Sequence, residues 1–343
     1  MSSDPADARD WLARLPKVEL HVHLEGAIPH EALWELVRKY GGDPAVPDLA
    51  SLEKKFVFRN FSHFVETWSW KNRFLREDED FVLIAEAVAR DLAGQNIRYA
   101  EVFFSPSDFA AFGLEPQRIA EAVRRGLARV PEIRISLVAD LVRDDGPVKA
   151  ARTLAEVYEA RVLGIIGIGI GGSESKFPPE PFGAVYEEAR RLGFRTSAHA
   201  GEAAGPESVW AAARLLRVDR IGHATRAAED ESLVEYLAER QIQLEMCPLS
   251  NVRTGVIDSL ERHPIRRFYD RGIPVTANTD DPKMFGTSLA EEYSCLMDRL
   301  RFTRNDIQTL VANAVRASWL PEPEKRALFE SIRDDPAGAK MTF

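Results

Sequence analysis

The sequence predicts an α/β protein built as a (β/α)8 TIM-type barrel. Short segments rich in Val, Ile and Phe alternate with longer segments whose apolar residues have helical spacing. There are eight such short segments, and eight strand–helix units close a barrel of parallel strands. No linker or change of composition divides the chain, so residues 1–343 are predicted to form a single domain. The predicted strands are residues 18–23, 97–104, 134–142, 165–171, 194–199, 220–223, 243–246 and 274–278.

Two of the segments between strands carry clear helix signals. Residues 206–216 begin with a proline, which is favoured in the first turn of a helix, and continue with Ala, Arg and Leu. Residues 230–240 have the same spacing of apolar positions, and Asp230 is the expected N-cap.

The connection between the first two predicted strands is much longer than the others. It runs through residues 27–96, and we predict a helical insertion there, because loops of this length normally contain helices or serve a function. We expect most of its aromatic side chains to pack in the insertion's own core. The alternative is a lid whose aromatic side chains cover a flat ligand at the mouth of the barrel. These aromatic residues are Phe56, Phe58, Phe61, Phe64, Trp68, Trp70 and Phe74.

Composition and charge exclude several classes of function. The chain has 45 Lys and Arg against 54 Asp and Glu, a net charge of −9, so nucleic acid is not expected as a partner. The longest uncharged apolar run, residues 162–172, is shorter than the ~18 residues that span a bilayer, so no membrane is expected. The first residues are acidic, unlike a signal peptide, and two cysteines are too few for a disulfide framework. We therefore expect a soluble protein of the reducing cytoplasm.

Histidines and aspartates gather where the predicted strands end. His21 and His23 close the first strand, and their period-two spacing points both side chains to the same side. In a (β/α)8 barrel the carboxyl ends of all strands meet on the face that carries active sites. Three imidazoles and a carboxylate suit a divalent ion, most often Zn²⁺, which lowers the pKa of a bound water toward neutrality. The other residues at strand ends are His199, His223, Asp280 and Asp281.

Two other patterns are not assigned to chemistry. Residues 167–172 match G-x-G-x-x-G, but they lie inside an apolar strand rather than at a strand-to-helix turn. We expect these glycines to let a ligand approach the backbone closely. Cys247 and Ser250 have no neighbouring base, so packing or loop capping is expected of them. Structural roles are also expected for His30, His63 and His263.

Six blocks of sequence make the chain similar to the adenosine deaminase family of metal-dependent amidohydrolases. The resemblance implies hydrolytic conversion of the 6-amino group of an adenine compound to a 6-oxo group, with release of ammonia. The small-molecule partner is then a purine. The blocks stand in the family's order at residues 15–26 (LPKVELHVHLEG), 99–102 (YAEV), 199–202 (HAGE), 220–223 (RIGH), 247–251 (CPLSN) with 254–255 (TG), and 278–282 (NTDDP).

The resemblance also implies a role for each site residue. Glu202 resembles the acid that protonates the purine ring, and it follows His199 by three residues, so it can stand beside the metal without being a ligand. His223 resembles the residue beside the attacking water, which it orients together with Asp280. Asp281 resembles a contact to purine N7, and Gly172 resembles the backbone donor to N3. The implied ligands of one zinc ion per chain are His21, His23, His199 and Asp280.

Departures from the family's pattern concern the substrate. Glu25 stands where many nucleoside deaminases have an Asp that faces the ribose, and Ser173 and Ala224 replace Asp and Gly. Residues 278–293 nonetheless look more like the nucleoside enzymes. We therefore predict adenosine, deoxyadenosine or an N9-modified relative, with Glu25 accepting a hydrogen bond from a sugar hydroxyl. Free adenine and aminodeoxyfutalosine are the alternatives.

Two other classes of protein stay open. A binuclear amidohydrolase generally needs a carboxylated lysine at the end of the fourth strand, and residues 165–174 contain no lysine. A non-catalytic relative that serves as a binding module would be expected to lose a metal ligand or the acid. All of the implied ligands, and Glu202, are present.

Overall fold

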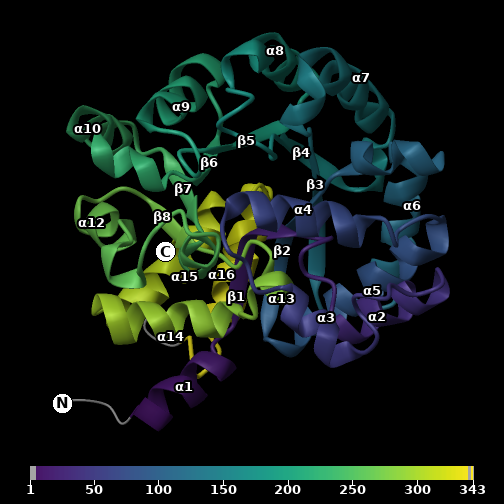
Figure 1. Cartoon of the computed structure of the whole chain (residues 1–343). Helices are drawn as coiled ribbons and strands as arrows, with labels where there is room; N and C mark the ends of the chain where they lie inside the picture. Colours follow the sequence, from purple (N-terminus) through teal and green to yellow (C-terminus); the bar gives the residue numbers. More distant parts are fainter. Residues whose placement is uncertain (1–4, 339–340, 343) are drawn as a thin grey trace.

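The computed structural model describes residues 5–338 and 341–342, and its centre is a sheet of eight parallel strands. The strands stand in chain order and pair with their neighbours, and the helices surround them (Figure 1). The predicted (β/α)8 barrel is therefore confirmed. The strands are β1 (Lys17–His23), β2 (Ile97–Phe104), β3 (Arg134–Asp140), β4 (Ile165–Gly169), β5 (Arg195–Ala200), β6 (Arg220–His223), β7 (Gln243–Met246) and β8 (Val275–Ala277).

The barrel closes between β1 and the residues that follow β8. The Asp280 N–H donates to the His21 carbonyl at 2.9 Å, and the His23 N–H donates to the Asp280 carbonyl at 2.8 Å. Below this pair, the Leu20 N–H donates to Asn278 Oδ1 at 3.1 Å. This closure fixes Asp280 between the two histidines of β1.

Some predicted strands are longer than the observed ones at the mouth of the barrel. β3 ends at Asp140 rather than residue 142, and β4 ends at Gly169 rather than residue 171. The chains still run side by side there, because the Arg143 N–H donates to the Gly171 carbonyl at 3.0 Å.

The helices follow the strands as the sequence predicts. The helix predicted over residues 206–216 is α9, continued by a π-helical segment over Ala211–Leu216, and Asp230 caps α10 by accepting from the Ser232 N–H at 3.0 Å. No helix in the described part of the chain has the length and apolar composition that crossing a membrane requires. The helices are α1 (Pro5–Arg14), α2 (His30–Lys39), α3 (Leu49–Lys55), α4 (Phe61–Asn72), α5 (Asp78–Gly94), α6 (Pro116–Leu127), α7 (Gly146–Glu159), α8 (Gly183–Arg191), α9 (Pro206–Trp210), α10 (Glu231–Arg240), α11 (Pro248–Arg253), α12 (Ile265–Asp270), α13 (Pro282–Phe285), α14 (Leu289–Leu300), α15 (Arg304–Ala317) and α16 (Glu322–Arg333).

The long connection between β1 and β2 contains four helices, α2 to α5. α5 packs against α6 and β2, as the outer helix of a barrel unit does. Six of the seven aromatic residues of the connection divide into two groups, and the seventh, Phe58, is partly buried against the hydrophobic core. Phe56, Trp70 and Phe74 are buried in the hydrophobic core, whereas Phe61, Phe64 and Trp68 of α4 line a cavity at the mouth of the barrel.

The interior of the barrel holds a buried ion cluster. The Arg220 guanidinium lies 2.6 Å from Glu101 Oε2, also pairs with Glu245, and stacks 3.6 Å from the centre of the Trp319 ring.

The glycines of β4 leave space for side chains in the barrel interior. A Cβ atom on Gly167 would lie 2.3 Å from the Trp319 ring. The expectation that this glycine admits a ligand is therefore wrong, because it admits a side chain of the protein.

Candidate active site

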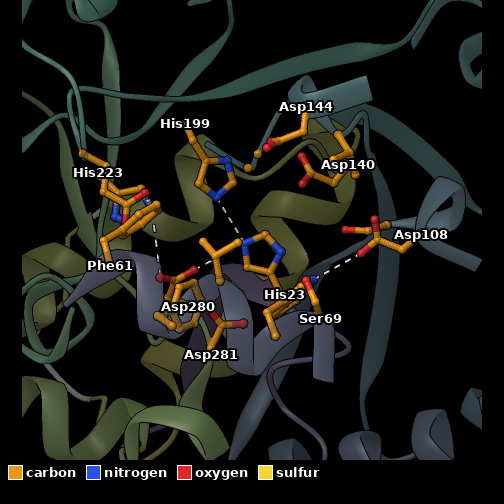
Figure 2. A pocket seen from close by; sticks show the side chains of 18 of the residues that line it. His23, Phe61, Ser69, Asp108, Asp140, Asp144, His199, His223, Asp280 and Asp281 are labelled. Atoms are coloured by element: carbon orange, nitrogen blue, oxygen red, sulfur yellow. Dashed lines mark hydrogen bonds and ion pairs between the residues drawn. The ribbon is translucent and has the colours of Figure 1, made fainter. Parts of the chain in front are cut away.

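Side chains from β1, β5 and the end of β8 converge at the carboxyl ends of the strands. The Nε2 atom of His199 lies 3.1 Å from Nε2 of His21 and 3.2 Å from Nε2 of His23. Asp280 Oδ1 lies 3.3 Å from His23 Nε2 and 3.6 Å from His21 Nε2. Figure 2 shows His23, His199 and Asp280 turned toward one another. Three imidazole nitrogens and one carboxylate oxygen at such separations form a donor set that suits a divalent cation.

Nδ1 of His21 and Nδ1 of His199 each face an acceptor of the protein, which leaves Nε2 of each ring free to bind a metal. His21 Nδ1 lies 2.8 Å from Glu245 Oε2, and His199 Nδ1 lies 3.0 Å from the Ile170 carbonyl. Each acceptor places the ring proton on Nδ1, so the Nε2 lone pair points into the site. Asp280 is held in the same way, because its Oδ2 atom accepts from the Ser250 hydroxyl at 2.6 Å.

His223 lies in the same cluster and is an alternative to His23 as the third imidazole ligand. Its ligand atom lies within 4.8 Å of those of His21, His199 and Asp280. Its Nε2 atom is 3.7 Å from Glu202 Oε2 and 4.0 Å from Asp280 Oδ2. Distance alone therefore allows either His23 or His223 to be the third imidazole ligand.

The backbone at the site adopts the left-handed conformation at three residues that are not glycine. His223 has a φ of 62°, Ala224 of 55° and Asp280 of 63°. This region costs free energy for residues with a side chain, and such residues cluster at functional sites. The departure at Ala224 noted in the sequence therefore falls on a position where glycine would be less strained.

The carboxylate of Glu174 fixes the loop that carries Glu202. Glu174, after β4, accepts hydrogen bonds from the backbone N–H groups of residues 201–204 at 2.6 to 3.0 Å and from the Ser208 hydroxyl at 2.5 Å. Glu202 itself is buried. Burial and the negative charges of Asp280 and Glu174 raise the pKa of Glu202 well above its usual value. This raised pKa favours the protonated form of Glu202, which can donate a proton.

A cavity of about 300 Å³ opens beside the cluster. It has an aromatic side from α4 and an acidic side from the loops after β2 and β3. Among the described residues that line it, none is a lysine or an arginine. The lining includes His23, Phe61, Phe64, Val65, Trp68, Ser69, Ser105, Asp108, Asp140, Asp144, Asp145, Gly171, Gly172, His199, Glu202, His223, Asp280 and Asp281.

Asp281 and Gly172 lie in this lining, as the sequence predicts for residues that contact a purine. Burial and the charge of Asp280 raise the pKa of Asp281 to about 8, so its carboxyl group can donate a hydrogen bond. Gly172 has a φ of 105°, and a Cβ atom there would lie 2.2 Å from Asp144 Oδ2. Only glycine suits this position, which explains one of the two glycines after β4.

Glu25 is hydrogen-bonded to a residue that lines the cavity, Ser105, but does not line it itself. It is buried, its Oε1 atom accepts from the Ser105 N–H at 2.9 Å, and it is not among the residues that line the cavity. Burial raises the pKa of Glu25, and the buried Lys71 of α4 opposes this shift. The Oε2 atom of Glu25 is buried without a hydrogen-bond partner among the described residues, and the ribose contact expected of Glu25 stays a prediction.

Several residues that hold the site are not identified from the sequence alone. In the sequence, Glu174 is only the last residue of the lysine-free segment 165–174, and Glu245 is only one residue of a predicted strand. Cys247 and Ser250 belong to the block at residues 247–251. Burial raises the pKa of the Cys247 thiol, and the Ser250 hydroxyl donates to Asp280. His263, expected to be structural, bonds to Asn251, which bonds to His223.

The barrel and the His/His/His/Asp group at its carboxyl face together define a metal-dependent hydrolase of the amidohydrolase kind. The adenosine deaminase family model matches residues 16–335, so the chain belongs to that family. It is a deaminase, a hydrolase that acts on C–N bonds.

Relatives with different substrates in their names are similarly close. The chain is 35% identical over 334 residues to the aminodeoxyfutalosine deaminase of Streptomyces coelicolor, covering 96% of this chain and 86% of the relative. It is 37% identical over 312 residues to the adenine deaminase of Bordetella parapertussis, covering 90% and 98%. The crystal structure of an amidohydrolase from Burkholderia ambifaria with bound zinc has a TM-score of 0.88 and 28% identity, covering 97% of this chain and 93% of that one.

Proposed function

We propose that this protein is a zinc-dependent deaminase of adenine nucleosides, adenosine or deoxyadenosine. The observation that carries the proposal is the position of Glu202. A buried carboxyl group with a raised pKa stands beside a three-histidine, one-aspartate donor set and lines the same cavity. Hydrolysis at C6 of adenine needs this pair, because attack on an aromatic carbon is slow unless ring nitrogen N1 accepts a proton.

In this proposal the chain's residues divide the proton transfers among them. A divalent cation at the donor set supplies Lewis-acid activation of a water molecule. The water oxygen bonds to C6 while Glu202 gives its proton to N1, and His223 and Asp280 orient the water. One proton of the water passes by way of Asp280 to the departing amino group, which leaves as ammonia. The other proton restores Glu202, and N1 keeps the proton that it received.

Two groups in the lining would orient the purine. N7 and N3 of adenine are acceptors, so the protein must present donors to both. The raised pKa of Asp281 gives it an O–H to donate to N7. The Gly172 N–H has no hydrogen-bond partner among the described residues, so it is free to donate to N3.

The acidic side of the cavity favours a neutral sugar on N9. Asp108, Asp144 and Asp145 line the cavity, and no lysine or arginine is among the described lining residues. Asp145 pairs with Lys149 of α7 at 2.7 Å, so Asp108 and Asp144 carry most of the negative charge of this side. Carboxylates accept hydrogen bonds from sugar hydroxyls, but they repel a phosphate or another carboxylate on the ligand. Adenosine therefore suits this lining better than AMP does.

Steady-state kinetics on adenine, adenosine, deoxyadenosine, aminodeoxyfutalosine and AMP test the substrate. We expect kcat/KM to be highest for adenosine or deoxyadenosine and lowest for AMP. Replacing both Asp144 and Asp145 with Asn should raise kcat/KM for AMP relative to adenosine by roughly three- to tenfold, because the repulsion is removed. Asp258→Asn, at an exposed ion pair with Arg262, is the control. A preference for free adenine would contradict the nucleoside assignment.

One metal ion per chain is expected. Purified protein should contain about one equivalent of zinc by elemental analysis, and removing it with a chelator should abolish ammonia release. A requirement for two equivalents, or full activity of the metal-free protein, would contradict the mononuclear site.

A further inference from the structure

The position of the ring proton on His223 decides what this residue can do. A ring nitrogen with a lone pair can bind a cation, whereas a ring nitrogen with a proton can only donate. Nε2 of His223 faces the donor set, and Nδ1 faces Asn251 of α11 at 3.0 Å. The partners behind Asn251 therefore determine the tautomer.

A chain of hydrogen bonds reaches Asn251 from the start of α12. Ile265 is the first residue of α12, so its N–H has no acceptor within the helix. It donates instead to Nδ1 of His263, at 3.3 Å. Burial lowers the pKa of His263 to about 3, so the ring is neutral. Because Nδ1 of this neutral ring accepts, its proton must be on Nε2.

The side-chain amide of Asn251 links this hydrogen bond of His263 to His223 and fixes which group donates at each step. His263 Nε2 lies 3.2 Å from Asn251 Oδ1 and donates to it. This bond fixes the orientation of the amide, since the rotated amide would place two N–H groups against each other. The Nδ2 group of Asn251 then donates to Nδ1 of His223, whose lone pair is used in that bond. His263 and Asn251 are both buried.

We propose that Asn251 and His263 are positioning residues that hold the ring proton of His223 on Nε2. His223 then has no lone pair toward the cation, so His23 completes the donor set with His21, His199 and Asp280. The Nε2–H group donates to the oxygen that attacks C6. Only this last role rests on the proposed function, because the tautomer and the donor set do not depend on the substrate.

Long-range ¹H–¹⁵N spectra of protein labelled with ¹⁵N-histidine measure the tautomer directly. His223→Gln identifies the signals of His223 among the seven histidines. We expect wild-type His223 to be protonated at Nε2 in both metal-free and zinc-loaded protein. A proton on Nδ1 in the wild type would overturn the proposal, and this outcome requires no variant to fold.

Asn251→Asp tests the direction of these hydrogen bonds by replacing one amide with a carboxylate. A carboxylate only accepts, so it should draw the His223 proton to Nδ1. We expect the spectrum to switch tautomer and kcat to fall about 10- to 100-fold, with KM little changed and zinc retained. Asn305→Asp, on the exposed start of α15, is the control for the added charge. An unchanged tautomer in Asn251→Asp would overturn the proposal.

Two replacements of His263 test the link behind Asn251. Gln can still donate to Asn251, so His263→Gln should keep the His223 proton on Nε2 and keep kcat. Phe keeps a flat ring but cannot donate, so His263→Phe should give a mixture of tautomers and a lower kcat. Equal spectra for the two variants would overturn the role of His263. If no adenine compound is deaminated while the tautomer switches as expected, the proposed function fails and the positioning role stands.

Discussion

Replacing Glu202 with glutamine should lower kcat by at least ~10²- to 10⁴-fold, with the zinc content unchanged. Glutamine keeps the shape of the side chain but has no acidic proton for N1. Its backbone N–H can still donate to Glu174, at 3.0 Å in the wild type, so the loop should keep its conformation. The measurement is ammonia release under saturating substrate, together with elemental analysis for zinc.

Glu239→Gln is a suitable control for Glu202→Gln. It removes one carboxylate from the exposed surface of α10, far from the chemistry, and should leave kcat unchanged. Turnover of Glu202→Gln close to the wild-type rate would show that another group protonates N1, and the role assigned to Glu202 would then be wrong.

Arg220→Met should lower the free energy of unfolding by about 3–5 kcal/mol. The guanidinium is buried between Glu101 and Glu245, and both carboxylates are fully buried. Methionine has a similar length but no charge, so two carboxylates would remain in the barrel interior without their counter-ion. The loss should appear as a lower urea midpoint followed by circular dichroism. Because Glu245 also holds His21, zinc affinity should fall about 10- to 100-fold.

Arg195→Met is the matched control for Arg220→Met. Arg195 begins β5 and pairs with Asp219 at 3.3 Å, but its side chain is exposed. Exposed pairs contribute about 0–1 kcal/mol, so the urea midpoint should hardly move. Adding Glu101→Gln to Arg220→Met should recover part of the loss, because one unpaired charge is removed. Equal stability of Arg220→Met and the wild type would contradict this account of the ion cluster.

The sequence determined the barrel and the edge at which its chemistry lies. Alternation of apolar segments with helical spacing is a local property, and eight parallel units have one common closed arrangement. Within that arrangement, the residue at the end of each strand must reach the same face. For this reason the sequence alone predicts that His21, His199 and Asp280, which are distant in the chain, lie together.

How these residues are held, and which of them line the cavity, follows only from the tertiary structure. Glu174 reaches the loop of Glu202 across 27 to 30 residues, and His263 reaches His223 through Asn251. Such contacts depend on the paths of loops and on side-chain rotamers, which have no period in the sequence. The same reason applies to Glu25. Its position two residues after His23 does not fix which side of the loop its carboxyl group takes, and in the structure its Oε1 atom accepts from the Ser105 N–H.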